Sequence, residues 1–366
     1  MNVAAHKRAG AAAAGAAPLV VRCGAFGDIV MLTTLIRLLH ARYGRRIDVL
    51  GAGPWTHALL EPLPEVGTVW TVRSRNTPYL LCPSQWTTVA WLRRRGRGPV
   101  YVCDTDTPTL RLLRRARLYQ EDRVQRVRED DEHDGVPRLW PDRWLRLGQR
   151  DPAHRYPCAG DVHAETFRLP RLVVAPADRA EVLQWKSAHG IGNSPCILFQ
   201  PGNKRTHKRG RLGAASNAKH WPATAWAELA KAIWTDLPDA RIVLCGSPAE
   251  HGVLDDIHAA TQRSPQMLNA ARELPVPRLL ALMERAHSMV SVDTGPAHAA
   301  AALACPLVVM FGAASPAKWR PIGPGAIQVL GGEHGSASRV ADIQVADVVH
   351  AWRALPARDQ PVLSMP

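Results

Sequence analysis

Two parts of this chain show the same alternation between short apolar runs and longer stretches of helical periodicity. In the first part, the expected strands are residues 19–23, 47–50, 68–72 and 100–103. The stretch 29–43, which lies between the first two strands, repeats its apolar residues at helical spacing. Because strands that are separated by helices pair in parallel, this pattern predicts an α/β protein with doubly wound sheets.

The alternation stops in the middle of the chain and then resumes. From residue 121 to about residue 177 the periodicity fails, and this segment contains several prolines and an acidic run. The alternation resumes at 195–200 and continues to a strand that ends before Gly312. We therefore expect two Rossmann-like domains that face a central cleft, with ligands bound outside the carboxyl ends of the strands. The expected segments are a flexible leader at 1–16, a first domain at 17–177, a second domain at 178–335 that ends in a Pro/Gly-rich stretch from 315, and a C-terminal helix and tail at 336–366.

Composition limits the class of protein. Hydrophobic residues make up 46% and charged residues 21% of the 366 residues, which is typical of a globular chain. No apolar run approaches the roughly 20 residues that span a bilayer. The alanine-rich segment 9–21 only weakly imitates a secretory signal. The seven cysteines include no Cys-x-x-Cys pair and share no ligand spacing with the histidines, so we expect reduced thiols in a cytoplasmic protein and no metal site.

The net charge of +14 requires either an anionic partner or a large solvated basic surface. Arginines crowd into 93–97 and 111–117, and lysine and arginine crowd into a segment at 203–218 that we expect to be a loop. Such clusters attract nucleic acid, anionic lipid or an acidic substrate, and the sequence does not choose among them. Aromatic residues do not interleave with these arginines, and no helix-turn-helix or RNA-binding signature occurs, which argues against nucleic acid.

One turn near the end of the second part predicts a binding site for phosphate or a nucleotide. The sequence Ser291-Val-Asp-Thr-Gly-Pro-Ala-His298 follows a buried apolar run and opens an alanine-rich helix. Free backbone N–H groups at the positive end of such a helix suit an anion, although a purely structural cap is the alternative. The expected N–H donors or cap residues of this turn are Asp293, Thr294, Gly295, Pro296 (which shapes the turn but has no N–H), Ala297 and His298.

Three further turns supply residues of suitable chemistry. Gly27-Asp28 follows the first strand, and Asp28 is either a general base or merely a first-turn acid that complements the helix dipole. Lys219 precedes a helix and either pairs with a departing phosphate or is an ordinary exposed lysine. Ser247 and Glu250 lie in a strand-to-helix turn where a carboxylate suits a ribose or a base edge.

Together these residues resemble glycosyltransferase family nine, the ADP-heptose:lipopolysaccharide heptosyltransferases. The matching features occur in order over roughly residues 19–325: Gly27-Asp28, Pro201-Gly202 followed by Lys219-x-Trp-Pro222, Gly246-Ser-Pro-x-Glu250, and Asp293-Thr-Gly-Pro-x-His298. The sequence departs from the family pattern at Ala304, which replaces a common glycine, and in the long basic segment 203–218.

The resemblance implies a GT-B fold whose first domain binds the acceptor and whose second domain binds the sugar nucleotide. It implies an inverting transfer of heptose from ADP-heptose to the lipopolysaccharide inner core, without a metal or cofactor, by a cytoplasmic protein that contacts the inner membrane peripherally. By this resemblance, Asp28 would remove the proton of the acceptor hydroxyl, and Lys219 would stabilise the charge of the leaving diphosphate. The turn at Thr294 and Gly295 would bind the phosphates, with Asp293 and His298 beside the sugar and diphosphate. Glu250 would contact the nucleoside. A GT-B epimerase or hydrolase, a basic nucleic-acid-binding protein and a catalytically silent homologue are the alternatives.

Overall fold

The computed structural model describes residues 16–119, 121–127, 138–214, 217–332 and 338–356. Almost all of the predicted leader therefore lies outside the described residues. The chain divides into two compact units, and each is considered by itself. Unit 1 takes the described residues of Met1–Ala25, Leu32–Val136 and Pro141–Arg168, and unit 2 takes those of Phe26–Met31, Pro137–Trp140 and Leu169–Pro366.

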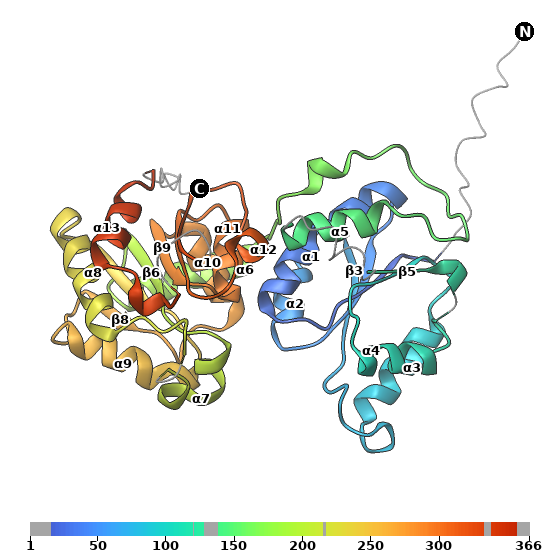
Figure 1. The fold of residues 1–366 in the computed structure, drawn as a ribbon, viewed down its shortest axis with the longest axis horizontal. Helices are drawn as coiled ribbons and strands as arrows, with labels where there is room; N and C mark the ends of the chain where they lie inside the picture. Colours follow the sequence, from blue (N-terminus) through green and yellow to red (C-terminus); the bar gives the residue numbers. More distant parts are fainter. Residues whose placement is uncertain (1–15, 120, 128–137, 215–216, 333–337, 357–366) are drawn as a thin grey trace, which may run out of the picture. The chain divides into compact units, whose positions relative to one another are not determined.

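Unit 1 is built on a five-stranded sheet in which every pair of neighbouring strands is parallel. The strands are β1 (Leu19–Val21), β2 (Ile47–Gly51), β3 (Val66–Thr71), β4 (Val100–Val102) and β5 (Val124–Arg126), in the order β3-β2-β1-β4-β5. The helices are α1 (Phe26–Tyr43), α2 (Trp55–Leu60), α3 (Pro83–Arg94), α4 (Thr107–Arg115) and α5 (Trp140–Gln149), with short 3-10 turns η1 (Tyr79–Leu81), η2 (Glu121–Arg123) and η4 (Ala164–Phe167) (Figure 1). Both faces of β1 and β4 are buried, which explains their continuous apolar sequences.

Unit 2 contains a six-stranded parallel sheet in the order β11-β10-β9-β6-β7-β8. Its strands are β6 (Cys196–Gln200), β7 (Arg241–Leu244), β8 (Met267–Asn269), β9 (Ser288–Val292), β10 (Leu307–Phe311) and β11 (Ile327–Gly331). Its helices are α6 (Pro176–Ala188), α7 (Lys204–Ala214), α8 (Ala223–Asp236), α9 (His251–Ala260), α10 (Val276–Arg285), α11 (Gly295–Ala302), α12 (Pro316–Trp319) and α13 (Val345–Arg353), with turns η5 (Pro248–Glu250) and η6 (Val340–Asp342). Helix α8 packs on α9 and α13, whereas α10 packs on α6 and α11, so the helices form two groups, as in a doubly wound domain.

Both sheets share one strand order that fixes where a ligand can bind. Counted from its own first strand, each sheet has the order 3-2-1-4-5, and unit 2 adds a sixth strand. The direction of winding reverses between β1 and β4 and between β6 and β9. In open α/β sheets such switch points form a crevice at the carboxyl ends of the strands, where ligands bind. The sequence prediction of two Rossmann-like sheets is confirmed, and two candidate sites follow from it.

Three segments that were predicted as irregular contain regular structure. The basic segment 203–218 forms α7 rather than a loop, because lysine and arginine are good helix formers, and this helix is kinked at Gly210, whose φ is 52°. The stretch from residue 121 contains β5 and α5, and the Pro/Gly-rich stretch from residue 315 contains α12 and the half-buried edge strand β11. These elements are too short, or too irregular in their apolar spacing, for periodicity to reveal them.

Two properties of the described residues complete the fold. All seven cysteines are free, and every one except Cys158 is buried. Among the described helices, none combines the length and the apolar character that a membrane crossing requires.

Replacing Gly323 by alanine is expected to lower the free energy of unfolding by about 1–3 kcal/mol, the usual cost of overpacking. A Cβ atom at Gly323 would lie 1.9 Å from the carbonyl oxygen of Ala301, and this oxygen belongs to the backbone of α11 and cannot rotate away. Urea unfolding measures the change. Gly160→Ala is the matched control, because a Cβ atom there meets nothing within 4 Å. Equal midpoints for the two variants would contradict this packing argument.

Candidate functional site

The turn between β9 and α11 lies at the switch point of unit 2 and presents unpaired backbone donors. The amide of Asp293 continues the sheet by donating to the carbonyl of Met310 over 2.9 Å. Thr294 is the N-cap residue, has an extended backbone, and its side chain makes no capping hydrogen bond. The amide of Ala297 donates to the carbonyl of Thr294 over 3.1 Å, so this expected donor is already used.

Two of the other expected donors remain available to a ligand. The amide of His298 is the fourth of α11, where the hydrogen bonding of the helix itself begins. Among the described residues, no acceptor is bonded to the amides of Thr294 and Gly295. They lie in the first turn of an eight-residue helix, whose dipole favours an anion. The lack of a side-chain cap and the open amides favour anion binding over a purely structural turn.

Lys219 lies directly beside this turn. Its ammonium group forms an ion pair with the carboxylate of Asp293 and also donates to the carbonyl of Asp293 over 3.0 Å. Its backbone amide donates to the side chain of Asn217, which fixes the chain just before α8. The side chain of Lys219 is 35% exposed to solvent, whereas that of Asp293 is 9% exposed. The structure therefore places Lys219 at the predicted phosphate turn, where it is ion-paired and only partly exposed.

The first residues of α1 group with unit 2 and pack against the same turn. A Cβ atom at Gly27 would lie 2.9 Å from Cδ2 of His298, and one at Gly295 would lie 2.8 Å from Cβ of Phe26. Only glycine at both positions lets the start of α1 approach the start of α11 so closely. Asp28 follows at once, is half-buried, and lies near enough to His298 for its charge to affect the pKa of that imidazole.

His298 is buried, and this burial lowers the pKa of its imidazole below the ordinary value of 6.5. The charges of Asp293 and Asp28 raise the pKa, and the charge of Lys219 lowers it further. The neutral form is therefore the one that the folded protein favours near neutral pH. The sequence-predicted residues Gly27, Asp28, Lys219, Asp293, Thr294, Gly295, Pro296 and His298 thus lie around one turn.

The stability of the protein is expected to fall as the pH drops below about 6.5, in part because of His298. Below this pH the unfolded chain binds a proton at His298 that the folded chain resists, so the free energy of unfolding rises with pH in this window. His298→Gln is expected to reduce the slope of the free energy of unfolding against pH by up to about 1.4 kcal/mol per pH unit. Chemical unfolding between pH 5.5 and 7.5 measures the slope, with His350→Gln on the exposed face of α13 as the control. Parallel curves for wild type and His298→Gln would contradict the argument.

Ser247 and Glu250 form a second polar turn, at the carboxyl end of β7. The buried carboxylate of Glu250 accepts hydrogen bonds from the amide and the hydroxyl of Ser247, each over 2.8 Å. Its other oxygen accepts from the hydroxyl of Thr206 on α7. Glu250 therefore closes a capping box and anchors α7. Sequence reasoning missed Thr206, because α7 was expected to be a loop.

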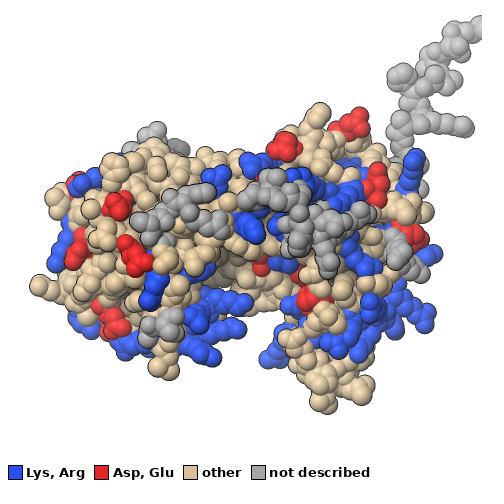
Figure 2. All heavy atoms as spheres, viewed as in Figure 1, with Lys and Arg blue, Asp and Glu red and all other residues tan. Residues whose placement is uncertain are grey.

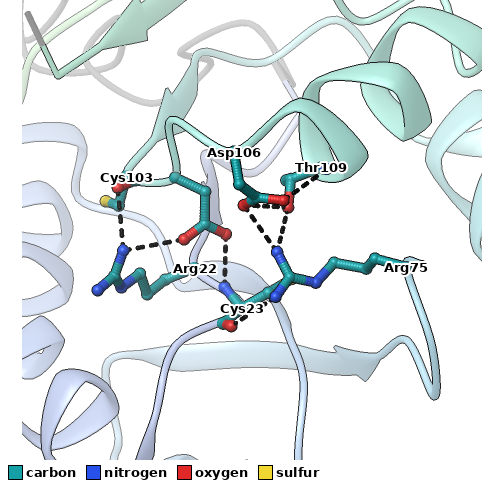
Figure 3. A network of polar contacts seen from close by, with 7 residues as sticks. Arg22, Cys23, Arg75, Cys103, Asp106 and Thr109 are labelled. Atoms are coloured by element: carbon teal, nitrogen blue, oxygen red, sulfur yellow. Dashed lines mark hydrogen bonds and ion pairs between the residues drawn. The ribbon is translucent and has the colours of Figure 1, made fainter.

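The switch point of unit 1 holds a network that sequence reasoning also missed (Figure 3). Arg22 follows β1 and donates to the carboxylate of Asp104 over 2.9 Å, and to the carbonyl of Cys103 over 3.3 Å. The second oxygen of Asp104 accepts from the amide of Cys23 over 2.6 Å. Burial raises the pKa of Asp104, and the guanidinium of Arg22 acts in the opposite direction.

Arg75 connects this network to α4. Its guanidinium donates to the carboxylate of Asp106 over 2.7 Å, to the hydroxyl of Thr109 and to the carbonyl of Cys23 over 3.1 Å. Asp106 is the N-cap of α4 and accepts from the amide of Thr109 over 3.0 Å. The two arginines hold the backbone that leads from β1 toward Gly27 and Asp28. The one available signal was position, since Arg22 and Asp104 each follow closely on the end of a strand.

Within the described residues, no group of three or more histidine, cysteine, aspartate or glutamate side chains is arranged to hold a metal ion.

Comparisons with known proteins identify relatives of this fold and sequence. The model of glycosyltransferase family 9 (heptosyltransferase) matches residues 176–346. Lipopolysaccharide heptosyltransferase 2 from Salmonella typhimurium and from Escherichia coli are each 26% identical over 313 residues, which cover 81% of this chain and 83% of each relative. The structure of E. coli ADP-heptose LPS heptosyltransferase II superposes with a TM-score of 0.69 at 24% identity, over 92% of this chain and 98% of that one. A family 9 glycosyl transferase from Veillonella parvula gives a TM-score of 0.70 at 16% identity, over 92% and 96%.

These findings confirm the resemblance to glycosyltransferase family nine and the GT-B fold class, and the relatives found are heptosyltransferases by name.

Proposed function

We propose, on the premise of this kinship with glycosyltransferase family 9, that the protein moves a heptose from ADP-heptose to a hydroxyl of the lipopolysaccharide inner core. The transfer inverts the anomeric centre and uses no metal ion or cofactor. The observation that carries this proposal is the turn of Asp293 to His298, where two open amides and an anchored lysine adjoin the half-buried carboxylate of Asp28. The relatives named as lipopolysaccharide heptosyltransferase 2 support heptose as the transferred sugar and lipopolysaccharide as the acceptor.

The open turn suits the diphosphate of the donor. The amides of Thr294 and Gly295 would donate to phosphate oxygens at the positive end of α11. An ammonium group has three protons, and among the described residues Lys219 donates to two oxygen atoms of Asp293, so a third proton could bind the diphosphate. Fixed donors of this kind stabilise the charge that develops on the leaving group as its bond to the sugar breaks.

Asp28 is the proposed general base. Its carboxylate would take the proton of the acceptor hydroxyl while that oxygen forms a bond to the anomeric carbon of the heptose. The bond between this carbon and the diphosphate oxygen breaks on the opposite face, and ADP leaves with the electron pair. A base on one side and stabilising charge on the other are what an inverting displacement requires.

The turn of Ser247 to Glu250 is proposed to border the nucleoside. Because both oxygens of Glu250 already accept hydrogen bonds, its carboxylate would act chiefly by holding the backbone of this turn in place. An anionic acceptor suits the basic charge of the chain, and the reaction is proposed to occur on the cytoplasmic side with peripheral contact to the inner membrane. No nucleic acid partner is proposed.

A screen of ADP-, UDP-, GDP- and CDP-sugars by calorimetry tests the donor. We expect ADP-heptose to bind most tightly and EDTA to leave transfer unchanged. NMR of the product made with a lipopolysaccharide-core acceptor tests inversion. Tighter binding of another nucleotide sugar would overturn the donor assignment. Release of free sugar or of an epimer at the same rate with and without acceptor would favour a hydrolase or an epimerase.

A further inference from the structure

Unit 1 carries a tip of exposed apolar side chains. Leu80 is 79% exposed, Leu81 is 74% exposed and Trp86 is 44% exposed. They belong to η1 and to the first turn of α3, which follow each other directly in the chain. A surface of this kind, on two consecutive short elements, is typical of a contact with a partner or a membrane.

The tip is held in an ordered conformation. The indole N–H of Trp86 donates to the carbonyl of Tyr79 over 2.7 Å, and the amide of Leu81 donates to the carbonyl of Pro78 over 3.0 Å. The side-chain amide of Gln85 donates to the carbonyl of Thr77 over 2.8 Å. The chain therefore presents these leucines to solvent from a closed turn with its own hydrogen bonds.

Arginines of α3 and α4 lie next to the tip. The guanidinium of Arg115 on α4 lies 4.5 Å from the ring centroid of Tyr79, and Arg93 donates to the carbonyl of Arg115 over 2.7 Å. Arg111 and Arg114 are exposed on the same helix. None of these four arginines forms an ion pair with any residue that the structure describes. Figure 2 shows basic side chains gathered over α3 and α4, next to an uncharged end of this unit.

The local charge balance is strongly one-sided. Residues 73–119 contain ten arginines and only two acidic residues, Asp104 and Asp106. Both aspartates are paired, with Arg22 and Arg75. The four arginines of α3 and α4 thus keep a positive field that the described residues do not neutralise with ion pairs, and exposed apolar side chains lie on the neighbouring elements.

We propose that this tip docks on the surface of an anionic phospholipid bilayer. Leu80, Leu81 and Trp86 enter the boundary between headgroups and acyl chains, and the arginines of α3 and α4 contact the headgroup phosphates. Apolar insertion combined with basic side chains is how proteins that lie on a membrane bind it. Single-stranded nucleic acid is bound on several successive aromatic platforms, but the ring of Tyr79 is covered by Arg115, leucines do not stack on bases, and Trp86 is the single exposed aromatic side chain among the described residues of the tip.

This inference deepens the proposed function, because it names the surface by which the enzyme would reach a lipid-linked acceptor. Its test needs neither donor nor turnover. Full-length protein is sedimented with vesicles of phosphatidylcholine alone and with vesicles that also contain phosphatidylglycerol. We expect binding to the anionic vesicles only, and weaker binding as the salt concentration rises.

Two double variants separate the apolar and the charged contributions. Leu80→Ser with Leu81→Ser is expected to weaken vesicle binding about tenfold or more, because two leucines lose their burial in the membrane. Arg111→Glu with Arg114→Glu is expected to weaken it at least tenfold, since each arginine near an anionic surface contributes roughly a fivefold gain. All four side chains are exposed, so folding is expected to be retained.

The matched controls lie on α7 in unit 2. Leu212 is 84% exposed, and Lys208 and Arg209 are exposed basic residues. Leu212→Ser, and Lys208→Glu with Arg209→Glu, are expected to leave vesicle binding within twofold of wild type. An equal loss from the controls, equal binding to neutral vesicles, or displacement from vesicles by short RNA at stoichiometric concentration would each overturn the proposal.

Donor titration of the tip variants keeps the two proposals distinguishable. Their affinity for nucleotide sugar is expected to equal that of wild type. If the wild-type protein binds no ADP-sugar but still docks through the tip, the proposed function fails and the docking surface stands. If donor binding is normal and the tip variants dock like wild type, the docking surface fails and the proposed function stands.

Discussion

Asp28→Asn is expected to lower kcat by about 10²–10⁴-fold while the affinity for donor stays within about twofold of wild type. The substitution preserves the shape of the side chain and removes its ability to accept a proton, so the acceptor hydroxyl must attack while still protonated. Asp28 is half-buried, and it adjoins the turn that is proposed to hold the leaving diphosphate. Steady-state transfer assays measure kcat, and calorimetry measures the binding of donor.

A control distinguishes this role from that of a simple first-turn acid. Asp347 occupies the first turn of α13 in unit 2. If Asp28 only complements the helix dipole, Asp28→Asn and Asp347→Asn should each cost about 0.3–1 kcal/mol of stability and leave transfer intact. Full transfer activity in Asp28→Asn would therefore remove the general base from the mechanism.

Lys219→Ala is expected to reduce transfer by about 10²–10³-fold and also to weaken donor binding, unlike Asp28→Asn. The variant loses the cation that faces the diphosphate, and it leaves the carboxylate of Asp293, which keeps only 9% of its exposure, without its ion-pair partner. That carboxylate would then repel the phosphates of the donor. Calorimetry with donor and with ADP measures the change in affinity.

A double-mutant cycle tests this explanation of the lysine. Removing the repelling carboxylate in Lys219→Ala with Asp293→Ala is expected to recover part of the donor affinity that Lys219→Ala loses. Lys231→Ala, at an exposed position of α8, is the control and is expected to bind donor like wild type. If the losses of donor affinity in the two single variants add up in the double variant, the ion pair between Lys219 and Asp293 does not contribute to donor binding.

The sequence allowed a good prediction of the turn between β9 and α11 because local chemistry determines it. A buried strand, a glycine and a proline at the start of a helix, and a second buried strand all lie within about two dozen consecutive residues. The position of Lys219 beside Asp293 was available only from the family resemblance, since 74 residues separate the two partners. Neither periodicity nor propensity carries information over such a separation.

The residues that sequence reasoning missed depend on long-range pairing or on marginal local signals. Arg22 and Asp104 are 82 residues apart, and only the parallel pairing of β1 with β4 brings them together. Helix α7 was mistaken for a loop because it is highly charged and its buried residues, Thr206, Gly213 and Ala214, form no apolar stripe. The strand β5 contains one apolar residue, Val124, whereas the equally short β1 and β4 are apolar throughout, so no apolar run reveals it.

The burial of the cysteines gives the protein a built-in reporter of its own unfolding. A thiolate is the form that reacts with alkylating reagents, and burial raises the pKa of Cys196 to about 11 and that of Cys103 still further. Of the seven free thiols, only that of Cys158 is exposed. Brief labelling with a maleimide should therefore add one group to the native enzyme and seven to the unfolded chain. Mass spectrometry can then count unfolded molecules in any of the variants above, without a purified donor or acceptor.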